Sequence, residues 1–201
     1  MMSKKRKQSP SGLVLILYGG PGSGKSTQAE ILTRKLKAPQ LNMGEALRQL
    51  TQKRTPSARE LREILARGKL APLAVSREIV KDFFRQHYSE PLLVIDGYPR
   101  SIPQAQTLSS LARKYRKRVL FVFLDLPIRV AVDRLVKRAR EEGRADDQPK
   151  AIAERLRIFK REAKKLFAFF GGQERVRVSG QGSVDEVNKR LESLLKKTGR
   201  L

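Results

Sequence analysis

The residues whose chemistry is easiest to interpret lie at 19–26, where the sequence reads Gly-Gly-Pro-Gly-Ser-Gly-Lys-Ser. Glycines can adopt positive φ and let backbone N–H groups wrap a phosphate, and a helix that begins directly afterwards adds partial positive charge. The Lys25 ammonium would neutralise β- and γ-phosphate oxygens, and the neighbouring hydroxyls would contact phosphate or Mg²⁺. The predicted nucleoside triphosphate site comprises Gly20, Pro21, Gly22, Ser23, Gly24, Lys25, Ser26 and Thr27.

A carboxylate follows the aliphatic run 92–95 and is the candidate partner for a metal. Asp96 ends that run, and a carboxylate at the carboxyl end of a buried strand typically holds Mg²⁺ through water. We therefore expect Ser26 and Asp96 to hold Mg²⁺, with water between the protein and the ion. Asp125 ends the next aliphatic run in the same way, but we interpret it as a strand-end residue.

Short aliphatic runs alternate with segments of helical pattern, which indicates βαβ units and a mostly parallel sheet. Expected strands are 13–18, 39–42, 92–95, 119–124 and 176–178. Expected helices are 25–37, 43–53, 57–67, 72–88, 103–115, 127–140, 152–169 and 184–195. This order predicts an α/β fold of the P-loop NTPase type, a three-layer sandwich around a parallel sheet of about five strands. The helices near 42–71 are too many for one crossover and should form a small lobe.

Five motifs in order then resemble the nucleoside monophosphate kinases, most closely the short-lid adenylate kinases. Besides the glycine-rich loop, these motifs are Asn42-Met43-Gly44-Glu45-Ala46-Leu47-Arg48, Gly68-Lys69-Leu70-Ala71-Pro72, Asp96-Gly97-Tyr98-Pro99-Arg100 with Gln104, and Gly143-Arg144-Ala145-Asp146-Asp147 with Arg155. The similarity covers about 13–195. It implies a kinase domain over 11–201, with a monophosphate-binding lobe at about 42–71 and a short lid at about 139–150.

The resemblance also implies roles for individual residues. Lys25, Arg100, Arg138, Arg144 and Arg155 would be catalytic. Arg134 and Arg138 would join the ATP site, with Arg134 packed on the adenine. The AMP site would comprise Met43, Gly44, Arg48, Lys69, Leu70, Ala71, Gly97, Arg100, Gln104, Arg144 and Arg155. Asp146 and Asp147 would support the lid. Arginine suits such a site because its planar fork binds phosphate oxygens bidentately.

Three departures from the family pattern bear on the substrate. Met43 replaces the usual Thr beside the acceptor nucleoside, Ser26 replaces a second Gly, and Glu45 replaces Asp. Because Gln104 occupies the position of the family's base-reading Gln, we expect AMP, with UMP or CMP as the alternative acceptor. The expected reaction is ATP + AMP = 2 ADP with Mg²⁺. With no cysteine and no His in the lid, a structural zinc is not expected.

The amino-acid composition limits the classes of protein and active site that remain possible. The 201 residues carry 44 Lys+Arg against 20 Asp+Glu, a net charge of +24, with no cysteine and one His. A disulfide framework, a thiol nucleophile and a Ser-His-Asp triad are thereby disfavoured. The apolar run 13–18 is too short for a secretion signal or a membrane span. We expect a cytoplasmic monomer that has a disordered basic tail at 1–10.

Two other functions remain open. A basic nucleic-acid-binding protein with a nucleotide-binding core would fit the charge, although the chain has few aromatic residues and no recognisable nucleic-acid-reading motif. Weak nonspecific binding to nucleic acid is expected in any case. A kinase for an uncharged acceptor on the same scaffold would have no use for both Arg48 and Arg100.

Overall fold

The protein is described by a computed structural model that covers residues 12–142 and 148–197. The expected disordered tail at 1–10 lies outside the described residues. So do three of the predicted lid residues, Arg144, Asp146 and Asp147. Their roles stay predictions.

The expected strands and helices occur in the expected order, with ends shifted by at most a few residues. In chain order they are β1 (Gly12–Gly19), α1 (Lys25–Leu36), β2 (Gln40–Asn42), α2 (Met43–Thr51), α3 (Pro56–Ala66), α4 (Leu73–His87), β3 (Leu92–Asp96), α5 (Ile102–Lys114), β4 (Lys117–Asp125), α6 (Ile128–Glu142), α7 (Pro149–Phe169), the 3₁₀ turn η2 (Phe170–Gly172), β5 (Glu174–Ser179) and α8 (Val184–Lys197). Helix α6 continues through Glu142 and α7 begins at Pro149, so both described ends of the predicted lid segment are helical.

All five strands are parallel and lie in the order β2-β3-β1-β4-β5. The chain moves from β1 to one side of the sheet for β2 and β3, and then to the other side for β4 and β5. Ligands in open α/β sheets bind at the carboxyl ends of the strands where this order reverses. Here that point lies at the end of β1, where Leu17 is in register with Asp96.

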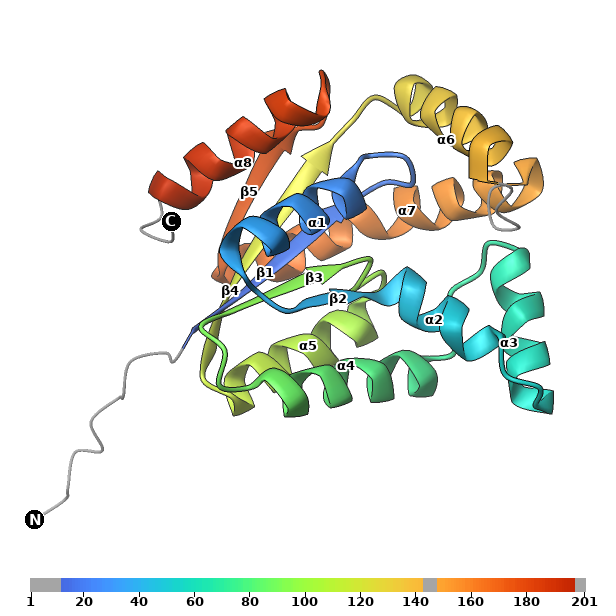
Figure 1. The fold of residues 1–201 in the computed structure, drawn as a ribbon, viewed down its shortest axis with the longest axis horizontal. Coiled ribbons are helices and arrows are strands. Elements are labelled where there is room, and N and C mark those ends of the chain that lie inside the picture. Colours follow the sequence, from blue (N-terminus) through green and yellow to red (C-terminus); the bar gives the residue numbers. More distant parts are fainter. Residues whose placement is uncertain (1–11, 143–147, 198–201) are drawn as a thin grey trace, which may run out of the picture.

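The sheet separates two helical layers. Helices α1 and α8 cover one face, and α4, α5 and α7 cover the other (Figure 1). Strand β1 can lie between the two helical layers because the side chains that it presents to each face of the sheet are apolar. All of its residues but the first are buried. This makes the end of β1 a rigid base for the loop that follows it.

Helices α2 and α3 project from one end of the sheet (Figure 1). Asn42 caps α2 by accepting a hydrogen bond from the Glu45 N–H at 3.0 Å. Thr55 caps α3 in the same way through Ala58 N–H, and Pro56 occupies the favoured first turn. The local sequence thus fixes where both helices begin. No helix in the described ranges is long and apolar enough to cross a membrane.

Candidate active site

The glycine-rich segment forms a tight loop between β1 and α1. Ser23 N–H donates to the Gly20 carbonyl at 3.1 Å, and Gly22 and Gly24 have φ of 78° and 85°. A Cβ at Gly22 would lie 2.5 Å from the Ala131 carbonyl oxygen, so a side chain there would press on α6. Gly24 is the N-cap of α1, which leaves the first N–H groups of that helix pointing toward the loop. This is the geometry of an anion site at a helix N-terminus.

Lys25 lies in the centre of a cluster of positive groups. Its Nζ donates to the Gly20 carbonyl at 3.2 Å. Burial lowers the pKa of Lys25 to about 8; Asp96 opposes this shift, and Arg100, Arg155 and Arg138 add to it. The structure therefore brings the four predicted catalytic cations among its described residues, from α1, α6, α7 and the loop after β3, within electrostatic reach of one another. Such a cluster is stabilised by a polyanion between its members.

Asp96 is 2% exposed, yet its Oδ1 accepts no hydrogen bond from the described residues. A buried carboxylate oxygen without a donor is costly, which indicates that a ligand completes it. Oxygen ligands suit Mg²⁺, and Ser26 lies in the first turn of α1 as predicted for a metal-side hydroxyl. The residues present thus fit a magnesium ion bound with the triphosphate. In 12–142 and 148–197, no group of three or more His, Cys, Asp or Glu residues is placed to hold a metal on its own.

The phosphate loop opens into a cleft of about 490 Å³, part of which is open to solvent. Its charged lining residues are Lys25, Arg100 and Arg155, and Leu70 lines the side near α3. The cleft also has a wall formed by Tyr18, Ile158 and Phe159, which was not predicted from the sequence. The Tyr18 and Phe159 ring centroids are 5.8 Å apart, and burial raises the pKa of Tyr18. The sequence did hold a signal for this wall, because Tyr18 immediately precedes the glycines and Phe159 lies one helical turn after Arg155.

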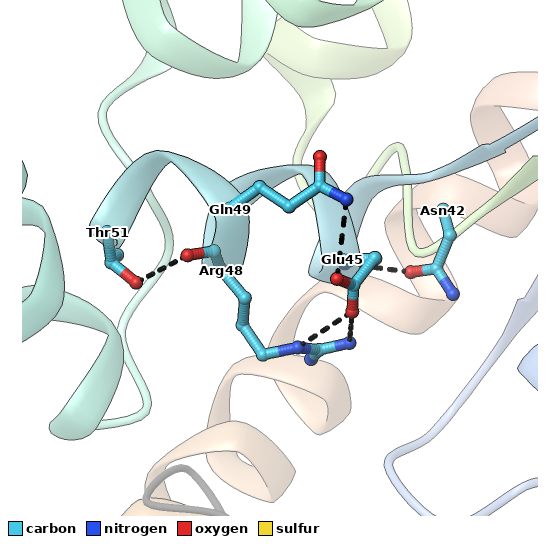
Figure 2. A network of polar contacts seen from close by, with 5 residues as sticks. All are labelled: Asn42, Glu45, Arg48, Gln49 and Thr51. Atoms are coloured by element: carbon cyan, nitrogen blue, oxygen red, sulfur yellow. Dashed lines mark hydrogen bonds and ion pairs between the residues drawn. The ribbon is translucent and has the colours of Figure 1, made fainter. Parts of the chain in front are cut away.

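Arg48 is held by a polar network at the start of α2 (Figure 2). Its Nε and Nη2 both donate to Glu45 Oε2, at 3.1 Å and 2.7 Å, while Gln49 approaches the other carboxylate oxygen at 3.5 Å. The Nη1 atom lies over Gly44, 3.5 Å from the position of an added Cβ. One edge of the guanidinium is therefore used by Glu45, and Nη1 lies beside the helix N-terminus.

Arg100 and Gln104 are joined through the backbone. Arg100 N–H donates to Gln104 Oε1 at 2.7 Å, and Arg100 Nε donates to the Gly97 carbonyl at 2.9 Å. Gln104 is buried and donates through Nε2 to Ser76 Oγ at 3.3 Å, a contact that sequence reasoning missed because Ser76 lies 28 residues earlier. A Cβ at Gly97 would lie 3.4 Å from Arg100 Nη2 and 3.6 Å from Met43 Cβ. The two motifs that start at 42 and 96 thus meet at Gly97.

The other predicted nucleotide-site residues lie in different surroundings. Met43 is buried in the apolar cluster beneath α2, Ala71 is buried, and Lys69 is exposed. Arg134 lies 3.8 Å from an added Cβ on Gly24, and its Nη2 donates to the carbonyls of Gly180 and Gly182 at 3.4 and 3.3 Å. Arg134 therefore lies between the phosphate loop and the turn after β5.

Asp125, which the sequence indicates is a strand-end residue, lies outside the cluster of site residues. Asp125 is exposed and lies 3.6 Å from Arg177, and its carbonyl accepts from Gly180 N–H. Arg157 forms an exposed pair with Glu154. Tight packing not foreseen from the sequence occurs at Gly68, where a Cβ would lie 2.4 Å from the Ala151 carbonyl oxygen of α7.

Comparison with known proteins agrees with this geometry. The family model described as adenylate kinase matches residues 17–175. The chain belongs to the adenylate kinase family. Similar relatives include adenylate kinases of Stenotrophomonas maltophilia (32% identical, covering 90% of this chain and 98% of the relative), Corynebacterium diphtheriae (32%, 88% and 95%) and Mycobacterium ulcerans (34%, 86% and 93%). The chain is accordingly an α/β phosphotransferase acting between nucleotides, as the ordered motifs predicted.

Proposed function

We propose that this adenylate kinase family member transfers the γ-phosphoryl group of ATP to AMP, as ATP + AMP = 2 ADP, with Mg²⁺ bound to the triphosphate. The observation that supports this most is that Lys25, Arg100 and Arg155 line one cleft, while Asp96, whose Oδ1 has no hydrogen-bond donor among the described residues, lies within electrostatic reach of Lys25. A cleft with excess positive charge suits two nucleotides that together carry many negative oxygens.

The donor ATP would occupy the phosphate loop. Loop N–H groups and Lys25 would bind the β- and γ-phosphates, while Arg134, beside the turn at 180–182, would pack on the adenine. Arg138 would reach the transferring group from α6. Mg²⁺, held through water by Asp96 and Ser26, would neutralise phosphate charge and orient its oxygens.

The acceptor would lie between the α2–α3 lobe, at about 42–71, and the loop after β3. Arg48 and Arg100 would bind its phosphate, and Gln104 would read its base beside the backbone of Lys69, Leu70 and Ala71. The contacts at Gly97 support this assignment, since they bring both arginine-bearing motifs to one point.

Catalysis would then consist of positioning and charge stabilisation, because phosphoryl transfer needs no covalent bond to the protein. The acceptor phosphate oxygen attacks the γ-phosphorus, and the ADP oxygen leaves in line. Arg100, Arg138 and Arg155 stabilise the charge that moves between them. The predicted lid at about 139–150, with Arg144, Asp146 and Asp147, would exclude water that could otherwise hydrolyse ATP.

A panel of acceptors tests the proposal. ADP formation is measured with ATP, Mg²⁺ and AMP, CMP, UMP or GMP in turn, with Lys25→Met as the inactive control. AMP should give the highest kcat/KM. Preference for UMP or CMP would establish the alternative acceptor, and no transfer to any monophosphate by folded protein would refute the proposal. The cytoplasmic location and the monomeric state expected from the sequence stay predictions.

A further inference from the structure

One exposed face of α7 carries a continuous row of positive side chains. Residues 157, 160, 161 and 164 follow helical spacing on one side, are all exposed, and are all Arg or Lys. Exposed Lys165 extends the row, and exposed Arg175 and Arg177 continue it on β5, which follows α7 through η2. We call Arg157, Lys160, Arg161, Lys164, Lys165, Arg175 and Arg177 the α7–β5 basic face.

This face differs from the basic surfaces of α3 and α4 in how few carboxylates balance it. On α3, Arg59 and Arg67 each lie within 3.8 Å of Glu63, and on α4, Lys81 and Arg85 pair with acidic residues one turn away. Such pairs give a neutral, solvated helix face.

On α7, by contrast, the three lysines of the face form no ion pair with any described residue. Its arginines pair with Glu154 and Glu162, and in β5 Arg177 lies 3.6 Å from Asp125. Lys160, Lys164 and Lys165 therefore leave a local excess of positive charge, which creates repulsion with no compensating contact inside this part of the chain.

Two of the arginines are fixed in place by an aromatic ring. Arg175 and Arg177 lie 4.5 Å and 4.6 Å from the centroid of the Phe167 ring, and Arg175 also donates to the Phe167 carbonyl. Stacking on a ring reduces the side-chain freedom that would be lost on binding a ligand. The guanidinium groups are thus preorganised beside the lysines of α7.

Most of the α7 residues of the basic face point away from the catalytic cleft. Arg155, Ile158 and Phe159 line the cleft, whereas residues 157, 160, 161 and 164 lie about 110–175° around the helix axis from the mean direction of these three, at 100° per residue. Lys165 lies about 75° from that direction. A ligand on the basic face therefore leaves the two nucleotide sites accessible.

We infer that the α7–β5 basic face binds the phosphate backbone of a nucleic-acid duplex. Lysines without carboxylate partners and stacked arginines match a dense row of phosphates, and the net charge of +24 attracts such a polyanion from a distance. A duplex fits better than a single strand, because the Phe167 ring is covered by arginine and is not available to stack on bases.

A lipid surface fits this face less well. The exposed large apolar side chains of the described residues are Tyr88, Ile128, Val136 and Val184. All four lie on or beside other helices, so the basic face offers no apolar group for insertion between lipids.

The salt dependence of binding gives a quantitative expectation. If four cations of the face neutralise phosphates, the affinity for duplex DNA should fall by about 150-fold between 50 and 200 mM salt, since log K changes by roughly −0.9 per contact for each decade of salt. The surface is tested by three neutral substitutions, Lys160→Gln, Lys164→Gln and Lys165→Gln, combined in one variant of the full chain.

The matched control carries Lys189→Gln, Lys196→Gln and Lys197→Gln on α8, where all three lysines are also exposed and the change in net charge is the same. Binding of labelled 20-base-pair DNA and RNA duplexes is followed by fluorescence anisotropy across the salt range. The α7 variant should lose at least about tenfold in affinity, and its salt slope should fall by nearly 3, while the control keeps both. Both variants should keep wild-type ADP formation.

Several outcomes would overturn the inference. Equal losses in the two variants would assign binding to overall charge and to no particular face. No duplex binding at 50 mM salt, tighter binding to a single strand, or tighter binding to vesicles of phosphatidylcholine and phosphatidylserine would each reject a duplex as the occupant.

Discussion

The pair formed by Glu45 and Arg48 gives a sharp test of how the acceptor phosphate is recognised. Glu45→Gln keeps the size of the side chain and removes its negative charge. Both side chains are partly exposed, at 48% and 38%, so the two hydrogen bonds to Oε2 should contribute only about 0.5–1 kcal/mol to the orientation of Arg48. We expect the acceptor KM to rise about two- to fivefold, because a change of 1.4 kcal/mol corresponds to a factor of 10.

The assay varies AMP at saturating ATP and then ATP at saturating AMP. Only the acceptor KM should change, while the ATP KM and kcat stay close to wild type. Gln49→Ala is the matched control, since the Gln49 amide contacts the other Glu45 oxygen, whereas the Arg48 guanidinium uses Oε2. In an Arg48→Ala background the effect of Glu45→Gln should disappear. An acceptor KM that falls, or an effect that persists without Arg48, would refute the positioning role.

Four further outcomes are expected. The kcat/KM for ATP should fall above about pH 8, because Lys25 in the free enzyme has its pKa lowered to about 8 and loses its charge there; a flat profile from pH 7 to 9.5 contradicts this. Asp96→Asn should lower kcat by about 100-fold and raise the Mg²⁺ requirement with little change in Tm, since Oδ1 has no donor to lose; unchanged magnesium dependence would count against it. Gly22→Ala should cost about 1–3 kcal/mol of stability and raise the ATP KM, as its Cβ meets the Ala131 carbonyl at positive φ; an unaltered melting curve would be unexpected. Ser76→Ala should reduce the AMP-to-CMP preference by up to about tenfold through release of the Gln104 amide; unchanged selectivity would exclude this route.

The sequence predicts most of the fold because its signals are local. The aliphatic run of β1 is too apolar for a surface strand, and the glycines that follow it leave room for a helix N-terminus. The helix starts expected at 43 and 57 agree with the structure to within a residue, and the structure shows why: Asn42 caps α2, and Pro56 occupies the first turn of α3. Parallel order follows because each strand is separated from the next by a helix.

What the sequence cannot predict depends on contacts between distant segments. Ser76 supports Gln104 from another helix, and the Tyr18–Phe159 wall joins β1 to α7. The lone carboxylate oxygen of Asp96 can be recognised only when every possible donor around it is placed. Periodicity and spacing carry no information on such pairs, which exist only after the sheet has assembled.

The close approach of Gly68 to Ala151 brings the turn after α3 against the start of α7, two segments that lie far apart in the sequence. The turn that leads out of α3 rests directly on the first turns of α7, with no room for even a methyl group between them. A displacement of that turn toward an incoming monophosphate must therefore push or release the same helix that carries Arg155. The two nucleotide sites would then be coupled through backbone contact between residues 68 and 151. A larger residue at 68 would push these segments apart and weaken that coupling.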